Sequence, residues 1–225
     1  MKPYYDEDGI TIYHGDMADV LPLLSESFDL VVTDPPYFQP ATHYVPARGS
    51  DPIRTLGDTS VLEHAFRVWA DLIEGRLSTA GAAYVFCDGQ SYPIVYRSFY
   101  RLGRVRPLVW DKLTSFNGYT WRHQHELIAW IERPNAERVP TGDGDVLRER
   151  AVPVERRRHP AEKPVGLMAR LMAKHGKGSV LDPFMGSGAS MEAARQVGSR
   201  YVGIEIEERY CEIAVQRLAQ GVLPL

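Results

Sequence analysis

The sequence predicts an α/β fold with a doubly wound, mostly parallel sheet. Short apolar segments alternate with amphipathic ones along the 225 residues, as expected for strands that alternate with helices. Phe28–Thr33 is apolar enough to be covered on both faces, as strands of parallel sheets are. Near the end of the chain, Ser179–Asp182, a glycine-rich turn, a helix and Tyr201–Glu205 form a strand–turn–helix–strand unit. The length suits one such domain, so we expect a single domain over residues 1–225.

The first half of the chain contains the other elements that precede or follow Phe28–Thr33. They are a strand at 10–13, a helix at 17–24, a helix that begins at Ser60 and keeps Phe66, Trp69, Ile73 and Leu77 on one face, a strand at 82–87 and a helix at 93–102. Residues 38–58 have no such pattern and form a loop far longer than usual. We therefore expect a mobile lid there.

The second half begins with two strands that have no helix between them. We pair Val105–Trp110 with Leu127–Ile131 as an antiparallel hairpin. Residues 133–158 are irregular and rich in proline and glycine. The remaining elements are a helix after Pro164 that keeps Met168, Leu171, Met172 and His175 on one face, a strand at 179–182, a helix at 189–197, a strand at 201–205 and a helix at 208–220.

The composition is that of an ordinary globular protein, with 44% hydrophobic and 24% charged residues. No apolar run approaches the roughly 20 residues that span a bilayer, and no apolar signal segment opens the chain. We therefore expect a cytoplasmic protein without membrane contacts. Cys87 and Cys211 fit buried, reduced thiols better than a disulfide or metal site. His123 and His125 have no evident further ligand, so we predict no metal centre.

The charge is unevenly distributed along the chain. The net charge is −3, yet residues 97–163 contain 14 Lys and Arg against 9 Asp and Glu. A basic middle within an acidic remainder suggests one surface that faces a polyanion. A solvated charged face accounts for the charges at least as well.

A carboxylate, two prolines and an aromatic ring directly follow Phe28–Thr33. They are Asp34, Pro35, Pro36 and Tyr37. The prolines make the chain leave the strand in a stiff, extended turn. Asp34 and the Pro35 carbonyl remain as a rigid pair of acceptors beside the Tyr37 ring, which suits an amino group on a flat ring. Taken alone, the four residues fit a strand-ending turn with a solvated aspartate equally well.

The glycine-rich turn lies between Asp182 and Gly188, and an acid, Glu205, ends the following strand. This layout is typical of a nucleotide-binding unit, with the acid placed for a ribose. Gly186 and Gly188 are not followed by the third glycine of the dinucleotide fingerprint, which weakens an NAD interpretation. A cofactor without a pyrophosphate needs less from the turn.

Together these residues resemble the family of DNA amino-methyltransferases that act on adenine N6 or cytosine N4 and use S-adenosyl-L-methionine. The order of the motifs is similar to that of the permuted, beta-type branch, in which the catalytic motif precedes the cofactor motif. The segments that carry the resemblance are Asp34-Pro35-Pro36-Tyr37, His125-Glu126, His159-Pro160-Ala161-Glu162-Lys163-Pro164 and Asp182-Pro183-Phe184-Met185-Gly186-Ser187-Gly188.

The resemblance implies a Rossmann-like class I methyltransferase fold. Its sheet is mostly parallel and seven-stranded with one antiparallel strand, which fits Leu127–Ile131. Asp34 and Asp182 should end adjacent strands, where such sheets bind ligands. The resemblance also implies a set of cofactor-binding residues, namely Asp16, Lys163, Asp182, Pro183, Phe184, Met185, Gly186, Ser187, Gly188 and Glu205.

Within that set, Asp16 would contact the adenine and Glu205 the ribose. Lys163 and Phe184–Gly188 would surround the methionine end. From the residues alone, an N-cap for Asp16 and a solvated cation for Lys163 are the simpler interpretations.

The implied reaction transfers a methyl group to the exocyclic amine of a base flipped out of DNA. Asp34 and the Pro35 carbonyl would accept the amine N–H bonds, and Tyr37 would stack on the base. Asp rather than Ser before Pro-Pro-Tyr favours adenine N6 over cytosine N4. Cytosine N4, a base in RNA and a non-catalytic nucleic-acid-binding module are the alternatives.

DNA is the expected partner. The side chains expected to contact it are His43, Arg48, Arg54, Trp121, Arg122, Arg156, Arg157 and Arg158. Residues 133–158 are the expected target-recognition insert. A bacterial or phage context follows from the resemblance, and a homodimer and a partner restriction endonuclease both stay open.

Overall fold

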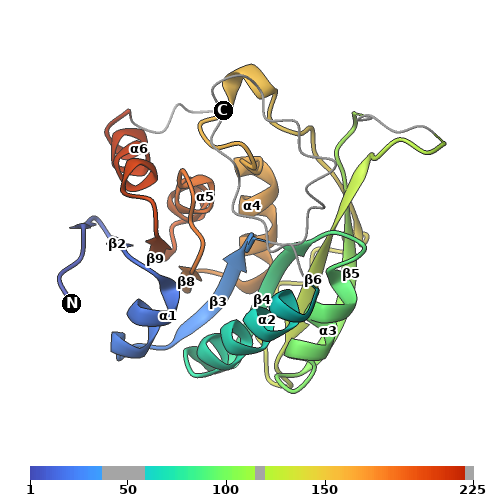
Figure 1. Ribbon diagram of the computed structural model, residues 1–225, viewed down its shortest axis with the longest axis horizontal. Helices are drawn as coiled ribbons and strands as arrows, with labels where there is room; N and C mark the ends of the chain where they lie inside the picture. The colour runs from blue at the N-terminus through green and yellow to red at the C-terminus, as the bar shows by residue number, and fades with distance from the viewer. Residues whose placement is uncertain (37–58, 115–119, 221–225) are drawn as a thin grey trace.

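The computed structural model describes residues 1–36, 59–114 and 120–220. Its strands form one sheet in the order β1-β2-β9-β8-β3-β4-β6-β5-β7 (Figure 1). The strands are β1 Tyr5–Glu7, β2 Ile10–His14, β3 Phe28–Thr33, β4 Leu77–Cys87, β5 Arg104–Asp111, β6 His125–Glu132, β7 Val146–Arg148, β8 Ser179–Asp182 and β9 Arg200–Glu205.

The predicted sheet forms the centre of this arrangement. Strands β2, β9, β8, β3 and β4 are mutually parallel, and β6 runs antiparallel to both β4 and β5. The predicted antiparallel hairpin is confirmed, with Val109 opposite Leu127. The count of seven strands omitted β1 and β7, which add one short strand at each edge, β1 antiparallel and β7 parallel to its neighbour. Each has three residues, too few to leave a periodic pattern.

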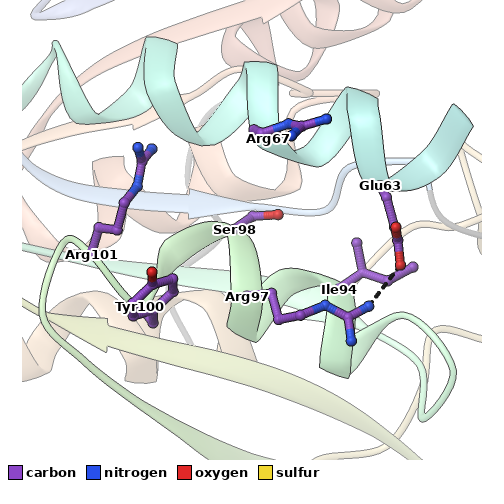
Figure 2. Close-up of a pocket in the computed structure, with 7 residues that line it drawn as sticks. All are labelled: Glu63, Arg67, Ile94, Arg97, Ser98, Tyr100 and Arg101. Atoms are coloured by element: carbon purple, nitrogen blue, oxygen red, sulfur yellow. Dashed lines mark hydrogen bonds and ion pairs between the residues drawn. The ribbon is translucent and has the colours of Figure 1, made fainter. Parts of the chain in front are cut away.

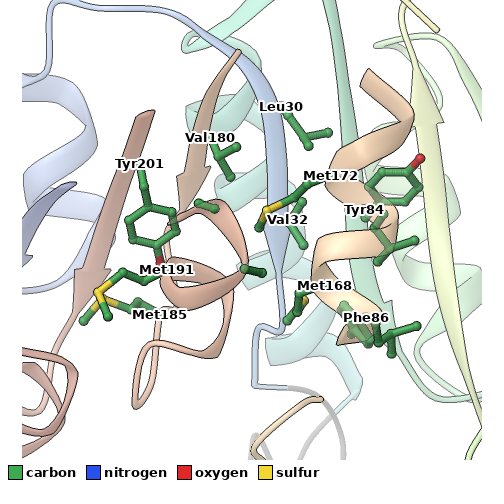
Figure 3. Packing of buried hydrophobic residues seen from close by; sticks show 14 of the residues in the cluster. Leu30, Val32, Tyr84, Phe86, Met168, Met172, Val180, Met185, Met191 and Tyr201 are labelled. Atoms are coloured by element: carbon green, nitrogen blue, oxygen red, sulfur yellow. The ribbon is translucent and has the colours of Figure 1, made fainter. Parts of the chain in front are cut away.

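Helices cover both faces of the sheet. They are α1 Met17–Val20, α2 Thr59–Glu74, α3 Tyr92–Phe99, α4 Val165–Met172, α5 Ala189–Val197 and α6 Glu208–Ala219, with 3-10 turns at Leu21–Leu23, Val154–Arg156 and Ala173–His175. One core lies under α4, α5 and α6, and the other under α1, α2 and α3. In the first core Met168 and Met172 of α4 pack over Leu30 and Val32 of β3 (Figure 3).

The helix predicted to include Leu77 is shorter than expected. Helix α2 ends at Glu74, and the Arg76 carbonyl then accepts a 2.7 Å hydrogen bond from the Phe28 N–H. Leu77 pairs with Phe28 in the sheet, so β4 begins there and not at Ala82. Leu77 continues the apolar spacing of the helix because it too is buried, but as the first residue of β4.

Two further predictions concern burial and membranes. Cys87 and Cys211 are both buried, as expected. None of the helices in the described ranges is long and apolar enough to cross a membrane.

Candidate active site

The sheet order places the ends of β3 and β8 side by side. These strands are parallel neighbours, with Leu30 opposite Val180. Asp34 directly follows β3 and Asp182 ends β8, so the two predicted motifs meet at one edge of the sheet. A 2.7 Å hydrogen bond from Thr33 Oγ1 to Asp182 Oδ1 joins the two strand ends.

Asp182 is the centre of a buried hydrogen-bond network. Besides Thr33, its carboxylate accepts from the Phe184 N–H at 3.0 Å and from Ser190 Oγ at 2.5 Å. Ser190 Oγ also lies 2.8 Å from the Tyr201 hydroxyl. Burial raises the pKa of Asp182 to about 6, although its three donors oppose the shift. Both carboxylate oxygens are thus occupied within the protein, and Asp182 shapes the turn that follows it.

The glycine-rich turn has a backbone conformation that residues with side chains rarely adopt. Gly186 and Gly188 have φ angles of +54° and +81°, values that favour glycine. A Cβ on Gly188 would lie 3.0 Å from the Ala214 Cβ. Ser187 Oγ is buried and has no hydrogen-bond partner among the described residues. Glycine at 188 therefore lets the turn pack closely against α6, and the Ser187 hydroxyl is left as an unpaired buried group that a ligand could use.

Glu205 holds the same turn from the end of β9. Its carboxylate accepts the Gly186 N–H at 2.8 Å and the Glu207 N–H at 2.9 Å. It is only 8% exposed, and burial raises its pKa. Strand β2 lies beside β9 with His14 opposite Glu205, so Asp16 follows the adjacent strand end. Asp16 caps α1 through a 2.9 Å bond from the Ala18 N–H, which confirms the N-cap prediction.

The carboxylate of Asp34 is paired on one side only. Lys163 Nζ lies 2.5 Å from Asp34 Oδ2 and 3.4 Å from Glu126 Oε2. Lys112 Nζ lies 2.5 Å from the other oxygen of Glu126. Asp34 Oδ1 is buried and has no hydrogen-bond partner in the described ranges. An unpaired buried acceptor is costly to a protein unless a ligand uses it.

The titration of these side chains follows from burial and from their mutual charges. Burial raises the pKa of Asp34, and Lys163 opposes part of that rise. Burial would also raise the pKa of Glu126, but Lys163 and Lys112 outweigh it and lower the value. For Lys163, burial lowers the pKa, and the attraction of Asp34 and Glu126 more than reverses this.

The segment that carries Lys163 is fixed against α6. The His159 ring packs edge-on against Tyr210, with ring centroids 4.5 Å apart, and Glu162 forms a buried ion pair with Arg217. Burial, followed by repulsion from Lys163, lowers the pKa of His159 to about 4. The Lys163 ammonium, expected at the methionine end of a cofactor, lies against Asp34 instead of in solvent.

Comparison with known proteins identifies the architecture. The sequence model of the family N6_N4_Mtase, described as DNA methylase, matches residues 28–216. The chain belongs to this DNA methylase family. The protein is therefore a DNA amino-methyltransferase.

The methylase resembles curated and solved proteins over most of its length. It is 25% identical over 247 residues to the type II methyltransferase M2.DpnII of Streptococcus pneumoniae, covering 96% of this chain and 92% of the relative. For M.ScaI of Streptomyces caespitosus the identity is 28% over 271 residues, covering 96% and 84%.

The solved structures share the fold. The PvuII cytosine-N4-specific DNA methyltransferase superposes with a TM-score of 0.78 at 16% identity, covering 99% of this chain and 91% of that one. The complex of M1.HpyAVI with S-adenosylmethionine gives 0.69 at 21% identity, covering 93% and 99%. The class I methyltransferase fold implied by the motifs is confirmed.

The side chains predicted to contact DNA have different fates. Tyr37, His43, Arg48 and Arg54 lie outside the described residues. Trp121 is 85% exposed, and Arg122, Arg156 and Arg158 are also exposed. Arg157 is half-buried and donates to the Val152 and Pro160 carbonyls at 2.8 and 3.0 Å, so its guanidinium is used within the methylase.

A groove of about 340 Å³ lies between α2 and α3 (Figure 2). Two of the three arginines that line it are in ion pairs, Arg97 with Glu63 at 2.7 Å and Arg101 with Asp71. None of the predicted catalytic or cofactor residues lines it.

Sequence reasoning missed the side chains that support the motifs. Lys112 was not assigned any role, and neither was Ser190. A signal for Lys112 existed, since the hairpin pairing of Asp111 with His125 brings Lys112 close to Glu126. Ser190 lies in the first turn of α5, where a hydroxyl can reach back to the preceding strand end.

Proposed function

We propose that the protein is a site-specific DNA adenine-N6 methyltransferase. DNA amino-methylation follows from its family. The observation that supports the role of Asp34 is its buried, unpaired Oδ1 at the edge where β3 and β8 meet. The choice of adenine rests on Asp rather than Ser before Pro-Pro-Tyr. The catalytic motif precedes the cofactor motif, which favours the permuted branch of the family.

S-adenosyl-L-methionine is the cofactor, and it supplies the methyl group. The described residues fit it, because the turn at 184–188 carries the Ser187 hydroxyl, which is buried and has no hydrogen-bond partner among them. Glu205 would hold the ribose and Asp16 the adenine, since Glu205 ends β9 and Asp16 follows the adjacent strand β2. Asp182 contributes indirectly, by fixing the turn through the Phe184 N–H.

The exocyclic amine of adenine is a poor nucleophile because its lone pair is shared with the ring. Asp34 Oδ1 and the Pro35 carbonyl would accept its two N–H bonds and favour a pyramidal nitrogen. Positioning and fixed charges then supply most of the catalysis. An adenine within a duplex must be flipped out to reach this edge, and stacking on Tyr37 remains a prediction.

Residues 133–158 remain our candidate for target recognition. The insert is tied to the methylase core, because Asp143 pairs with Arg170 at 3.1 Å and also with Lys174. Val139 donates to the Lys174 carbonyl at 2.7 Å. A segment anchored in this way can present side chains to DNA in a fixed position.

Cytosine N4 is the second candidate, because the PvuII enzyme, which shares the fold, is cytosine-N4-specific. The two are separated by incubating the protein with labelled S-adenosyl-L-methionine and, in parallel, unmethylated DNA and RNA, followed by nucleoside analysis. We expect label in N6-methyladenine. Label in N4-methylcytosine would overturn the adenine assignment, and label in RNA alone would overturn the choice of DNA. The Asp34→Ala variant is the control for contaminating enzymes.

A further inference from the structure

Four charged side chains of alternating sign form a row that ends at Asp34. Lys112 follows β5, Glu126 lies in β6, Lys163 precedes α4 and Asp34 follows β3. The nitrogen-to-oxygen distances along the row are 2.5 Å, 3.4 Å and 2.5 Å. Four separate segments thus contribute to one neutral array.

The array lies in largely buried surroundings, where an unpaired charge is destabilising. The Lys163 side chain is only 5% exposed, and those of Asp34 and Glu126 are 15% and 16% exposed. The Lys163 ammonium also lies 5.3 Å from the centre of the Phe86 ring. A charge in such surroundings is tolerated only when partners surround it, so each member depends on its neighbours.

The two carboxylate oxygens of Asp34 differ in their hydrogen-bond partners. Lys163 binds Oδ2, whereas Oδ1 is buried and unpaired among the described residues. Glu126 and the Ala161 carbonyl, 3.4 and 3.5 Å from Nζ, hold the ammonium from the other side. The carboxylate is therefore fixed in one orientation with one acceptor left over.

We propose that Lys163, held in place by Glu126, is the positioning residue of the catalytic carboxylate. It occupies Oδ2 and keeps Asp34 ionised, so that Oδ1 is available to the N–H of the target amine. This inference rests on the role proposed above for Asp34. Lys163 and Glu126 act through Asp34 and need not touch the base.

The proposal predicts how activity depends on pH. The groups that face Asp34 are Lys163, Glu126 and Lys112, together with Cys87 at the end of β4 and Asp182 at the end of β8. Lys163 lowers the pKa of Asp34, whereas Glu126 raises it. Loss of the ammonium and loss of the Glu126 charge should therefore move the acidic limb of the rate profile in opposite directions.

The experiment measures the single-turnover rate of methyl transfer between pH 5 and pH 9, at saturating S-adenosyl-L-methionine and DNA. In Lys163→Met we expect the acidic limb to move up by about one pH unit or more. In Glu126→Gln it should move down. In Lys163→Arg, which keeps the positive charge, the acidic limb should stay close to its wild-type position. Arg97→Ala, in the distant α2–α3 groove, is the matched control.

Unchanged limbs in both variants, shifts in the same direction, or an equal loss of rate at every pH would each overturn the proposal. If Lys163→Met does not fold, as judged by thermal unfolding, Glu126→Gln decides alone, and a limb that does not move down refutes the inference. The Asp34→Ala variant distinguishes a failure of the role proposed for Asp34 from a failure of the role proposed for Lys163. Full turnover in that variant refutes the role of Asp34 itself, whereas its inactivity with unmoved limbs refutes only the role of Lys163.

Discussion

Thr33 Oγ1 donates a 2.7 Å hydrogen bond to Asp182 Oδ1, and this bond joins residues 149 positions apart. It connects the strand that leads into the catalytic turn with the strand that leads into the glycine-rich turn. Both side chains are almost fully buried, with 1% and 2% exposure. The two halves of the site are therefore held in register by a polar contact inside the sheet.

Replacing Thr33 with valine should loosen this junction. Thr33→Val keeps the shape of the side chain but removes the donor, which leaves Asp182 Oδ1 with the Phe184 N–H. We expect the free energy of unfolding to fall by about 1–2 kcal/mol and the affinity for S-adenosyl-L-methionine to fall with it. Urea denaturation and calorimetric titration measure the two effects. Thr33→Ser, which retains the hydroxyl, should remain close to wild type, and equal losses in both variants would contradict the role of the bond.

Removing the acceptor at Asp34 should separate chemistry from cofactor binding. Asp34→Ala should reduce methyl transfer by at least about a hundredfold, because the amine loses its ionised partner. The cofactor dissociation constant should change little, since the turn at 184–188 does not depend on Asp34. Asp71→Ala on α2, an exposed aspartate, is the control. Wild-type turnover in Asp34→Ala would refute the assignment.

Replacing Glu205 should have the opposite effect, weakening cofactor binding more than it slows methyl transfer. In Glu205→Gln the amide NH₂ would face the N–H of Gly186 or Glu207, both of which now donate to the carboxylate. The turn would be disturbed and the ribose would lose an ionised acceptor, so we expect the cofactor dissociation constant to rise by about tenfold or more. The rate at saturating cofactor should fall much less. An unaltered dissociation constant would rule out the ribose contact.

His159 should make the protein sensitive to mild acid. Its pKa in the folded state is about 4, lowered by burial, whereas an unfolded histidine has a pKa of about 6.5. The unfolded state therefore binds the proton more tightly. This contribution to stability is complete above about pH 6.5 and is lost as the pH falls toward 4, by about 2 kcal/mol between pH 7.5 and pH 5.

The His159→Gln variant lacks this titration. Its unfolding free energy should decline less than that of the wild type between pH 7.5 and pH 5, as measured by urea denaturation at each pH. Parallel curves for the two proteins would show that His159 titrates normally in the folded state.

Local patterns were sufficient for most elements of the fold. The exact bounds of Phe28–Thr33, Ser179–Asp182 and Ala189–Val197 were predicted, because apolar runs, helical periodicity and glycine stops are properties of neighbouring residues. Leu77 was misplaced for the same reason, since a buried strand residue can coincide with the spacing of the preceding helix. The short strands β1 and β7 are defined by their partners and carry no pattern of their own.

The sequence by itself determined the family resemblance and the positions of the two motifs, because a short motif is legible without its surroundings. Only the tertiary structure decided what those motifs contact. The Lys163 ammonium contacts Asp34, 129 positions away in the sequence, and Glu126 contacts the same ammonium from a third segment. Such contacts depend on strand order and on the depth at which each side chain is buried, and neither can be read from neighbouring residues. The sequence alone suggested that Lys163 is a solvated cation, whereas in the fold its side chain is buried and paired with Asp34.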